Sequence, residues 1–254
     1  MISLVVLTHN RWGYTKQCLT RISEVTDRDF QLIVLDSASV DETRDELKRI
    51  KLSNDHLVDF KFIFFRDNIG CRAINAGFAT AMFDILLKVD NDVLLPYGWA
   101  SYLVKASSLF PDVMFGANPV FITEKTVQFP NPGCISHSID GVVFDEIVTN
   151  QNISGTFMAM KRDVYERIGK YRAPANSGYG GGDSLYCTLA NEQNVTYGYL
   201  RAIQLEMIPG STGPFTPEEG RTIPHVVEKR AELVKWHTAT CSITDAPIEL
   251  IIQK

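Results

Sequence analysis

The stretch Ile85-Leu86-Leu87-Lys88-Val89-Asp90-Asn91-Asp92 decides the fold, because it changes from apolar to acidic between two consecutive residues. Its first five residues are apolar except Lys88, a composition typical of a β-strand that is covered on both faces. Strands of this kind belong to parallel sheets, and ligands bind beyond the carboxyl ends of such strands. The stretch therefore predicts an α/β fold with an acidic ligand site at residues 90–92.

Three earlier apolar runs complete the pattern of a parallel sheet, at residues 2–7, 32–35 and 62–65. Apolar residues recur at helical spacing from Tyr14 to Val25, and Ser39-Val40-Asp41-Glu42 has the form of a capping box that opens a helix to about Ile50. Residues 72–82 are rich in alanine and suit a further helix. The order βαβαβαβ predicts a mostly parallel, twisted, doubly wound sheet with helices on both faces.

The second half of the chain is less regular, and we expect it to form a smaller lobe of the same single domain, residues 1–254. The pattern predicts helices at 96–110, 163–168 and 183–192, and strands at 113–121, 156–161 and 195–207. Proline and glycine gather in Phe129–Gly141, predicted to be a loop, and in Gly210–Pro224, predicted to be a mobile loop.

Length and composition suit one globular domain with a formal net charge of −5 over 254 residues. DNA-binding proteins usually present a basic face, so this balance disfavours nucleic acid as the main partner without excluding a local basic groove. The five cysteines lack zinc-type spacing, which indicates free thiols in a reducing compartment. No leader-like segment and no apolar run of about 20 residues occurs, so we expect a soluble, cytoplasmic protein without a transmembrane segment.

Asp90 and Asp92 are the strongest candidates for binding a ligand. Two carboxylates one residue apart at the end of a buried strand repel each other, and a bound cation relieves that repulsion. Hard divalent ions such as Mn²⁺ or Mg²⁺ take oxygen ligands and bridge to phosphates. The alternative interpretation is a polar turn between strand and loop.

The other predicted strands also end in polar residues on the same edge of the sheet. Thr8-His9-Asn10-Arg11 follows the first strand, and Asp36-Ser37 follows the second, where a carboxylate can accept hydrogen bonds from ribose hydroxyls or a base N–H. Gly70 after the third strand permits unusual backbone angles, and Arg72 can face a phosphate at a helix start. Turn formation at Asp36 and an incidental arginine at Arg72 remain open.

Asp183 is the candidate catalytic residue. It follows Gly180-Gly181-Gly182, which let a second substrate approach the backbone closely, and it opens a predicted helix. A carboxylate there can take the proton of an attacking hydroxyl. A role as helix N-cap is the alternative, and the two roles are compatible.

Taken in order, these stretches resemble family 2 glycosyltransferases, which have the GT-A fold. The resemblance covers residues 2–95 well, including Asn68-Ile69-Gly70 through Asn75-Ala76-Gly77. It continues more loosely through Ser154-Gly155-Thr156, Lys161-Arg162, Gly169 and Gly180–Asp183.

The resemblance implies a role for each matching position. Thr8, Asn10 and Arg11 would line the nucleotide pocket, Asp36 would contact base or ribose, and Arg72 would lie near the donor phosphates. Asp90 would contact ribose or metal and Asp92 would ligate the metal, with His225 as a further ligand after the Gly/Pro stretch. Asp183 matches the base of inverting members, although the acidic residue that usually precedes it is replaced by Gly182. The remaining positions expected on the nucleotide side are Ser37, Asn68, Gly70, Asn75 and Asn91.

The function implied is a metal-dependent, inverting transfer of a sugar from a nucleoside-diphosphate sugar, UDP favoured, to an acceptor hydroxyl. Residues 1–95 would bind the nucleotide and residues 96–254 the acceptor, which is a carbohydrate or another hydroxyl-bearing molecule; a nucleic-acid acceptor is disfavoured but left open. Two alternatives are a degenerate GT-A domain that only binds saccharide or nucleotide, and a sugar nucleotidyltransferase. The latter class usually carries a glycine-rich basic loop where this chain has Thr8–Gly13.

Overall fold

The computed structural model describes residues 1–120, 133–149, 151–172, 182–209, 211 and 249–252. The strands are β1 Ile2–Thr8, β2 Phe30–Ser37, β3 Leu57–Phe65, β4 Ile85–Asp90, β5 Val93–Leu94, β6 Met114–Val120, β7 Cys134–Ile139, β8 Val142–Ile147, β9 Phe157–Lys161, β10 Tyr197–Met207 and β11 Glu249–Ile252. The helices are α1 Trp12–Val25, α2 Thr43–Arg49, the 3₁₀ turn η1 Gly70–Arg72, α3 Ala73–Ala79, α4 Trp99–Leu109, α5 Arg162–Ile168 and α6 Gly182–Glu192.

One sheet runs through the described part of the chain, in the order β11-β3-β2-β1-β4-β9-β6-β10-β8-β7, with β5 paired to β10. β3, β2, β1 and β4 are parallel neighbours, as the sequence predicts. The register sets Thr8 opposite Asp36 and Leu7 opposite Asp90. The carboxyl ends of three buried strands therefore reach the same edge of the sheet side by side.

The sheet is mixed rather than mostly parallel, which corrects the sequence-based expectation. β9 is antiparallel to both β4 and β6, and β10 is antiparallel to β8 although parallel to β6. The reason is visible at the start of β9, where the carbonyl of Thr156 accepts a hydrogen bond from the amide of Asp90 at 3.1 Å. The chain thus enters β9 at the edge of the sheet where Asp90 and Asp92 lie, which we call the acidic edge, and runs away from it.

A β-hairpin occupies the part of Phe129–Gly141 that the structure describes, where the sequence predicts a loop. β7 and β8 pair from Cys134↔Ile147 to Ile139↔Val142 around the turn Asp140-Gly141. Both turn residues have positive φ, 49° and 77°. An Asp-Gly pair with positive φ at both positions matches the right-handed twist of the flanking strands. This local signal outweighs the two prolines that indicate a loop.

The predicted capping box is also wrong. Helix α2 begins at Thr43, and its first residue receives no side-chain cap from Ser39. The Ser39 hydroxyl instead accepts a hydrogen bond from the amide of Asn10 at 2.7 Å. Asp41 Oδ1 accepts from the amide of Thr43 at 3.0 Å and so supports the turn into the helix. Ser39 therefore joins the loops after β1 and β2 instead of starting a helix.

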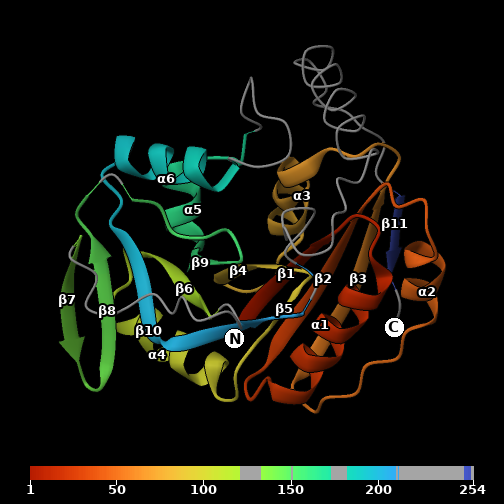
Figure 1. Ribbon diagram of the computed structural model, residues 1–254, viewed down its shortest axis with the longest axis horizontal. Coiled ribbons are helices and arrows are strands. Elements are labelled where there is room, and N and C mark those ends of the chain that lie inside the picture. The colour runs from red at the N-terminus through yellow and green to blue at the C-terminus, as the bar shows by residue number, and fades with distance from the viewer. Residues whose placement is uncertain (121–132, 150, 173–181, 210, 212–248, 253–254) are drawn as a thin grey trace.

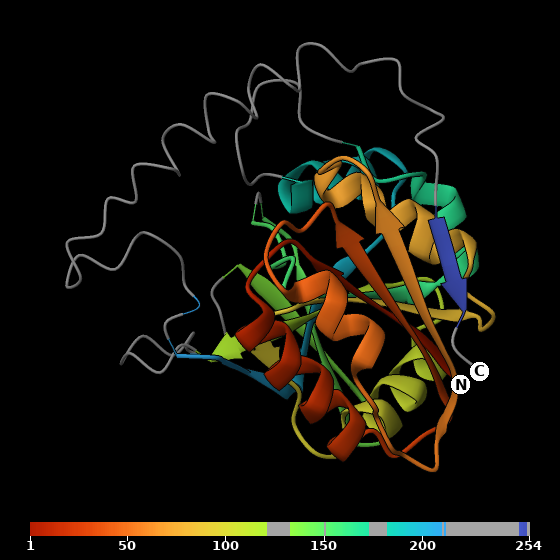
Figure 2. The same cartoon turned by 90° about the vertical axis from the view of Figure 1, so that its right-hand side faces the viewer.

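Helices cover both faces of the sheet, as predicted (Figure 1). α1 and α4 pack on the face that includes Leu4 and Val6, and α3, α5 and α6 pack on the face that includes Val5. Figure 2 shows α1 and α2 along the first face and β11 beside β3 at the edge of the sheet.

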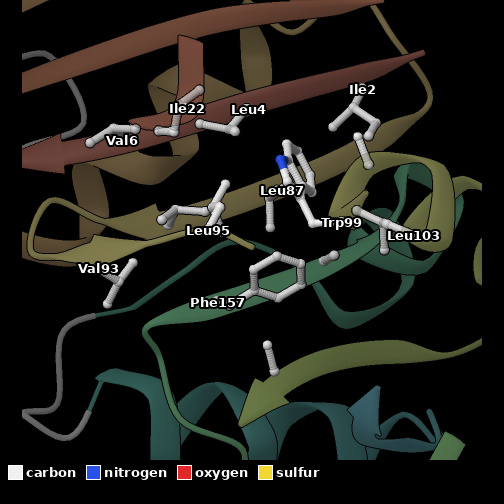
Figure 3. Packing of buried hydrophobic residues seen from close by; sticks show 14 of the residues in the cluster. Ile2, Leu4, Val6, Ile22, Leu87, Val93, Leu95, Trp99, Leu103 and Phe157 are labelled. Atoms are coloured by element: carbon white, nitrogen blue, oxygen red, sulfur yellow. The ribbon is translucent and has the colours of Figure 1, made fainter. Parts of the chain in front are cut away.

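Trp99 anchors the middle of the first face. Its ring meets Phe157 edge-on, at 6.4 Å between centroids, and Leu87 belongs to the same cluster (Figure 3). Leu87 on β4 and Phe157 on β9 belong to antiparallel neighbours, so this contact locks the two halves of the sheet together. No helix in the described part of the chain has the length and apolar character needed to cross a bilayer.

Gly77 fixes how closely α3 packs on β1. A Cβ at this position would lie 2.8 Å and 2.9 Å from the two methyl carbons of Val5. Gly77→Ala should therefore lower the free energy of unfolding by about 1–3 kcal/mol, the usual cost of overpacking. Urea denaturation measures this value.

Gly13→Ala is the matched control, because Gly13 lies in α1 and a Cβ added there would have no neighbouring atom within 4 Å. Its unfolding midpoint should be unchanged or slightly raised. Equal destabilisation by the two substitutions would contradict the packing argument.

Candidate active site

The loops after β1 and β2 are held in unusual backbone conformations at the acidic edge. Asn10, Arg11 and Ala38 have φ values of 57°, 66° and 60°, which non-glycine residues rarely adopt. The amide of Asn10 donates to Ser39 Oγ, and its side-chain Oδ1 accepts from the amide of Val40 at 2.8 Å. Such conformations cost free energy and persist where the surroundings enforce them, often at functional sites.

Asp90 and Asp92 lie where the sequence predicts, at and just beyond the end of β4. Each already contacts a cationic side chain: Asp90 Oδ1 lies 2.5 Å from Lys88 Nζ, and Asp92 Oδ2 lies 3.3 Å from an Arg11 nitrogen. Burial raises the pKa of Asp92, the negative charge of Asp90 raises it further, and Arg11 opposes both. Arg11 and Lys88 offset part of the repulsion between the two carboxylates, and the remaining negative charge favours a bound cation.

Arg11 connects this acidic pair to the end of β10. Its guanidinium donates to the carbonyl of Ser211 at 2.5 Å and lies 4.6 Å from the centroid of the Tyr14 ring. The amide of Ile208 donates to the carbonyl of Asp92 at 3.0 Å. The chain after β10 is thus held at the acidic edge twice: through Arg11, which contacts the side chain of Asp92, and through the backbone carbonyl of Asp92.

Lys88 belongs to the site, whereas the sequence pattern marks it only as an exception in an apolar strand. It is 4% exposed, and Nζ donates to both Asp90 Oδ1 and the carbonyl of Gly155. Burial disfavours its charged form, but the negative charges of Asp90 and Asp183 outweigh that effect and raise its pKa. A single charged residue in an otherwise apolar strand is the signal that could have found it.

Asp183 lies in the first turn of α6 and packs against Gly155. The segments of these two residues, both in the looser part of the family resemblance, therefore meet here. A Cβ on Gly155 would overlap the carboxylate of Asp183. Burial raises the pKa of Asp183, while the charge of Lys88 and a hydrogen bond from the Gly155 backbone oppose that rise. Gly155, which the resemblance includes in Ser154-Gly155-Thr156 without a role of its own, creates the space that Asp183 fills.

Cys71 occupies the space beside Gly182. A Cβ on Gly182 would lie 2.9 Å from Cys71 Sγ, closer than real Cβ atoms approach. Burial raises the pKa of the Cys71 thiol and the charge of Asp183 adds to it. The absence of an acidic side chain at position 182 is therefore matched by a thiol that fills its place.

At the end of β2, Asp36 is fully buried and paired with Arg44. The Arg44 Nε lies 2.7 Å from Asp36 Oδ2, and the amide of Ser39 donates to the carboxylate at 3.3 Å. Burial raises the pKa of Asp36, and the contacts from Ser39 and Arg44 oppose this rise. Asp36 thus reaches the predicted edge, but its carboxylate holds the loop after β2.

Ser37 and Asn68 join the loops after β2 and β3. Ser37 Oγ donates to Asn68 Oδ1 at 2.9 Å and accepts from the amide of Ile69 at 3.0 Å. Asn68 Oδ1 also accepts from the amide of Gly70, whose φ of 56° makes the turn into η1. These residues shape the rim of the site through contacts with each other.

Thr8 and Asn91 form a buried network below the rim. The side-chain amide of Asn91 donates to Thr8 Oγ1 at 3.2 Å and to Thr15 Oγ1 at 2.8 Å, and the two hydroxyls are 2.8 Å apart. Asn91 therefore orients the turn that carries Asp90 and Asp92.

Two further predicted residues, Asn75 and Arg72, make hydrogen bonds to segments outside this network. Asn75 directs its side chain to the backbone of Tyr171, donating to its carbonyl at 3.0 Å and accepting from its amide at 2.8 Å. Arg72 ends η1, where its Nε donates to the carbonyl of Ile69 at 3.4 Å. His225 lies outside the described residues.

The donor set of the acidic pair suits a hard divalent cation. The described residues contain no cluster of three or more His, Cys, Asp or Glu side chains arranged to hold a metal. Mg²⁺-type sites, however, need only one or two carboxylates when substrate phosphates and water complete the shell. Asp90 and Asp92 supply two carboxylates at one edge, so the residues present fit such an ion.

Sequence comparison assigns the chain to a family. Residues 3–169 match glycosyl transferase family 2, so the chain belongs to that family. A sequence search of curated proteins found no match.

Solved structures of similar fold are glycosyltransferases with the GT-A fold, and they share little sequence with this chain. GalNAc-T7 with UDP, GalNAc and Mn²⁺ has a TM-score of 0.60 at 14% identity, covering 82% of this chain and 44% of that one. The mannosyltransferase PcManGT from Pyrobaculum calidifontis, with GDP-Man and Mn²⁺, has a TM-score of 0.60 at 16% identity, covering 95% and 76%. TarS of S. aureus with UDP-GlcNAc has a TM-score of 0.58 at 16% identity, covering 82% and 59%. The chain thus spans less than two thirds of GalNAc-T7 and TarS, and the likeness shows the GT-A fold.

Gly155→Ala tests the placement of Asp183. The new methyl group would displace the Asp183 carboxylate from the space it occupies. A displacement of about 1 Å can cost 10²-fold in rate, so we expect a loss of transfer of that order. Steady-state kinetics measure kcat, and calorimetry measures donor affinity, which should stay within a few-fold of wild type.

Ser154→Ala is the control next in the chain. Its hydroxyl contacts Thr156, at 3.1 Å between the two Oγ atoms, and not Asp183. It should keep most of the activity. A Gly155→Ala protein with normal kcat would show that the position of Asp183 does not matter.

Proposed function

We propose that the chain transfers a sugar from a nucleoside-diphosphate sugar to an acceptor hydroxyl, with inversion at the anomeric carbon and with the help of Mn²⁺ or Mg²⁺. The observation that carries the proposal is the meeting of Asp90 and Asp92 on one side, and Asp183 on the other, around the buried ammonium of Lys88. The two carboxylates that would hold a cation for the diphosphate, Asp90 and Asp92, therefore share one site with the partly buried carboxylate of Asp183. Membership of glycosyl transferase family 2 supports the reaction class.

Asp183 acts as the general base in this proposal. Its carboxylate takes the proton from the acceptor hydroxyl while that oxygen bonds to the anomeric carbon. The bond between the anomeric carbon and the diphosphate oxygen breaks on the opposite face, and the electron pair leaves with the diphosphate. One such displacement inverts the configuration, by the same logic as water activation in inverting glycosidases.

Asp90 and Asp92 would hold the divalent cation, which supplies charge neutralisation at the diphosphate when bound. Arg11, next to Asp92, is placed to contact the phosphates or to leave Asp92 when a cation arrives. We assign the nucleotide to residues 1–95 and the acceptor to residues 96–254. UDP is favoured because UDP or a UDP-sugar is present in the GalNAc-T7 and TarS structures, although PcManGT contains GDP-Man.

Asp92→Asn tests the cation site. The amide keeps the shape of the side chain but removes its charge, so UDP should bind about tenfold more weakly, or worse, in the presence of Mn²⁺. Calorimetry with and without chelator measures this. Wild-type affinity for UDP that is unaffected by chelator would count against a metal at this edge.

Asp183→Asn separates catalysis from binding. It should lower kcat by two to four orders of magnitude, the usual contribution of a general base, while UDP affinity changes little. A collapse of donor affinity would instead make Asp183 a binding residue.

The pH dependence of kcat gives a second measure of the base. Asp183 must be ionised to accept a proton, and its pKa is raised above the ordinary 3.8 by burial. The rate should therefore fall as pH decreases, beginning at a higher pH than an exposed aspartate would give. Asp183→Asn should lose this acidic limb, and a limb that survives the substitution would assign it to another group.

A further inference from the structure

Lys88 is the one lysine that is buried in the described part of the chain, and it lies between the donor and acceptor sides of the site. β4 carries it next to Asp90, the segment before β9 brings Gly155 to it, and α6 brings Asp183 within electrostatic reach. A buried charge of this kind is costly unless it is paired and hydrogen-bonded. Its two contacts with Asp90 and Gly155 meet that requirement.

The backbone of Gly155 connects Lys88 to Asp183. The carbonyl oxygen of Gly155 accepts a hydrogen bond from Lys88 Nζ. The carboxylate of Asp183 lies against the Cα of Gly155, in the space that a Cβ would fill. The carbonyl carbon is bonded to this Cα, so fixing the carbonyl also restrains the Cα against which Asp183 packs.

Lys88 also orients Asp90. It contacts Oδ1 of that carboxylate at 2.5 Å, so Oδ2 is the oxygen that remains to face a cation. A lysine ammonium can serve two acceptors in different directions because it is a compact charge with three donors. The same ammonium thus acts on the donor carboxylate and on the backbone that holds the base.

We propose that Lys88 is a positioning residue that holds the base Asp183 in register with the cation-binding carboxylate Asp90, through the backbone of Gly155. The inference rests on the proposed function of Asp90 and Asp183. Lys88 touches neither the donor nor the acceptor in this proposal. Its contribution is the fixed distance between the hydroxyl that loses its proton and the diphosphate that departs.

Two substitutions separate the parts of this role. Lys88→Met keeps the apolar stem and removes both the charge and the hydrogen bonds, and should lower kcat about 100-fold because the base is no longer held. Lys88→Gln keeps a donor for the Gly155 carbonyl without the charge, and should recover part of that loss. UDP affinity in the presence of Mn²⁺ should stay within about threefold of wild type or become tighter, because Asp90 has lost a competing cation.

Lys61→Met is the matched control. Lys61 also pairs with an aspartate two residues away on its own strand, with 3.1 Å between Lys61 Nζ and Asp59 Oδ2, but it lies on β3 away from the acidic edge. It should keep wild-type kcat. Circular dichroism and thermal unfolding establish that each variant is folded before its kinetics are compared.

A purely structural role for Lys88 predicts a different result. kcat and UDP affinity would then fall together, in Lys88→Gln as in Lys88→Met. That outcome, or a wild-type kcat in Lys88→Met, would overturn the proposal.

A crystal structure of the wild-type chain with Mn²⁺ and UDP provides a readout that needs no variant. Lys88 Nζ should remain within hydrogen-bond distance of both Asp90 and the Gly155 carbonyl. Loss of the contact with Gly155 in the complex would contradict the proposal even if neither variant folds.

The two levels of the argument fail separately. Transfer retained by Asp92→Asn and Asp183→Asn would reject the proposed function, and the role of Lys88 with it. Transfer lost in those variants but normal in Lys88→Met would reject only the role of Lys88.

Discussion

This structure depends on one constraint, which is that several carboxylates gather at one edge of the sheet and repel one another. Asp90, Asp92 and Asp183 approach one another where water is scarce, and burial alone would drive the two whose pKa values are raised, Asp92 and Asp183, toward their neutral forms. Lys88 and Arg11 make the arrangement tolerable by placing positive charge among them. The site is therefore partly neutralised by the chain itself, and it keeps an excess of negative charge for a ligand to compensate.

The path of the backbone explains how residues so distant in sequence reach this edge. Parallel pairing aligns the carboxyl ends of β1, β2 and β4, and the antiparallel strand β9 starts at the same edge and runs back through the core. The segment before β9 then supplies Gly155, and α6 covers it with Asp183. The packing of Trp99 against Phe157 on β9, in the cluster that also contains Leu87 on β4, helps to hold the two strands in this relation.

The parts that could be predicted from sequence are those governed by local pattern. The parallel strands and the position of Asp90 and Asp92 follow from apolar runs that end in polar residues, and the structure confirms where these residues lie. The Asp140-Gly141 hairpin is also a local signal, but two nearby prolines obscure it. The sequence pattern could not predict the hydrogen-bond partners of Ser39 and Lys88, because these partners lie 29 and 67 residues away along the chain.

The tight fit between Cys71 and Gly182 makes the residue type at one position depend on the other, although the two lie far apart in sequence. Any side chain at 182 would collide with the sulfur at 2.9 Å, whereas the Cβ of residue 71 is 3.4 Å away and would not obstruct it. An acidic side chain at position 182 therefore requires the Cys71 side chain to turn away or to be replaced by a smaller one. The side chain that position 182 accepts thus depends on the residue at position 71.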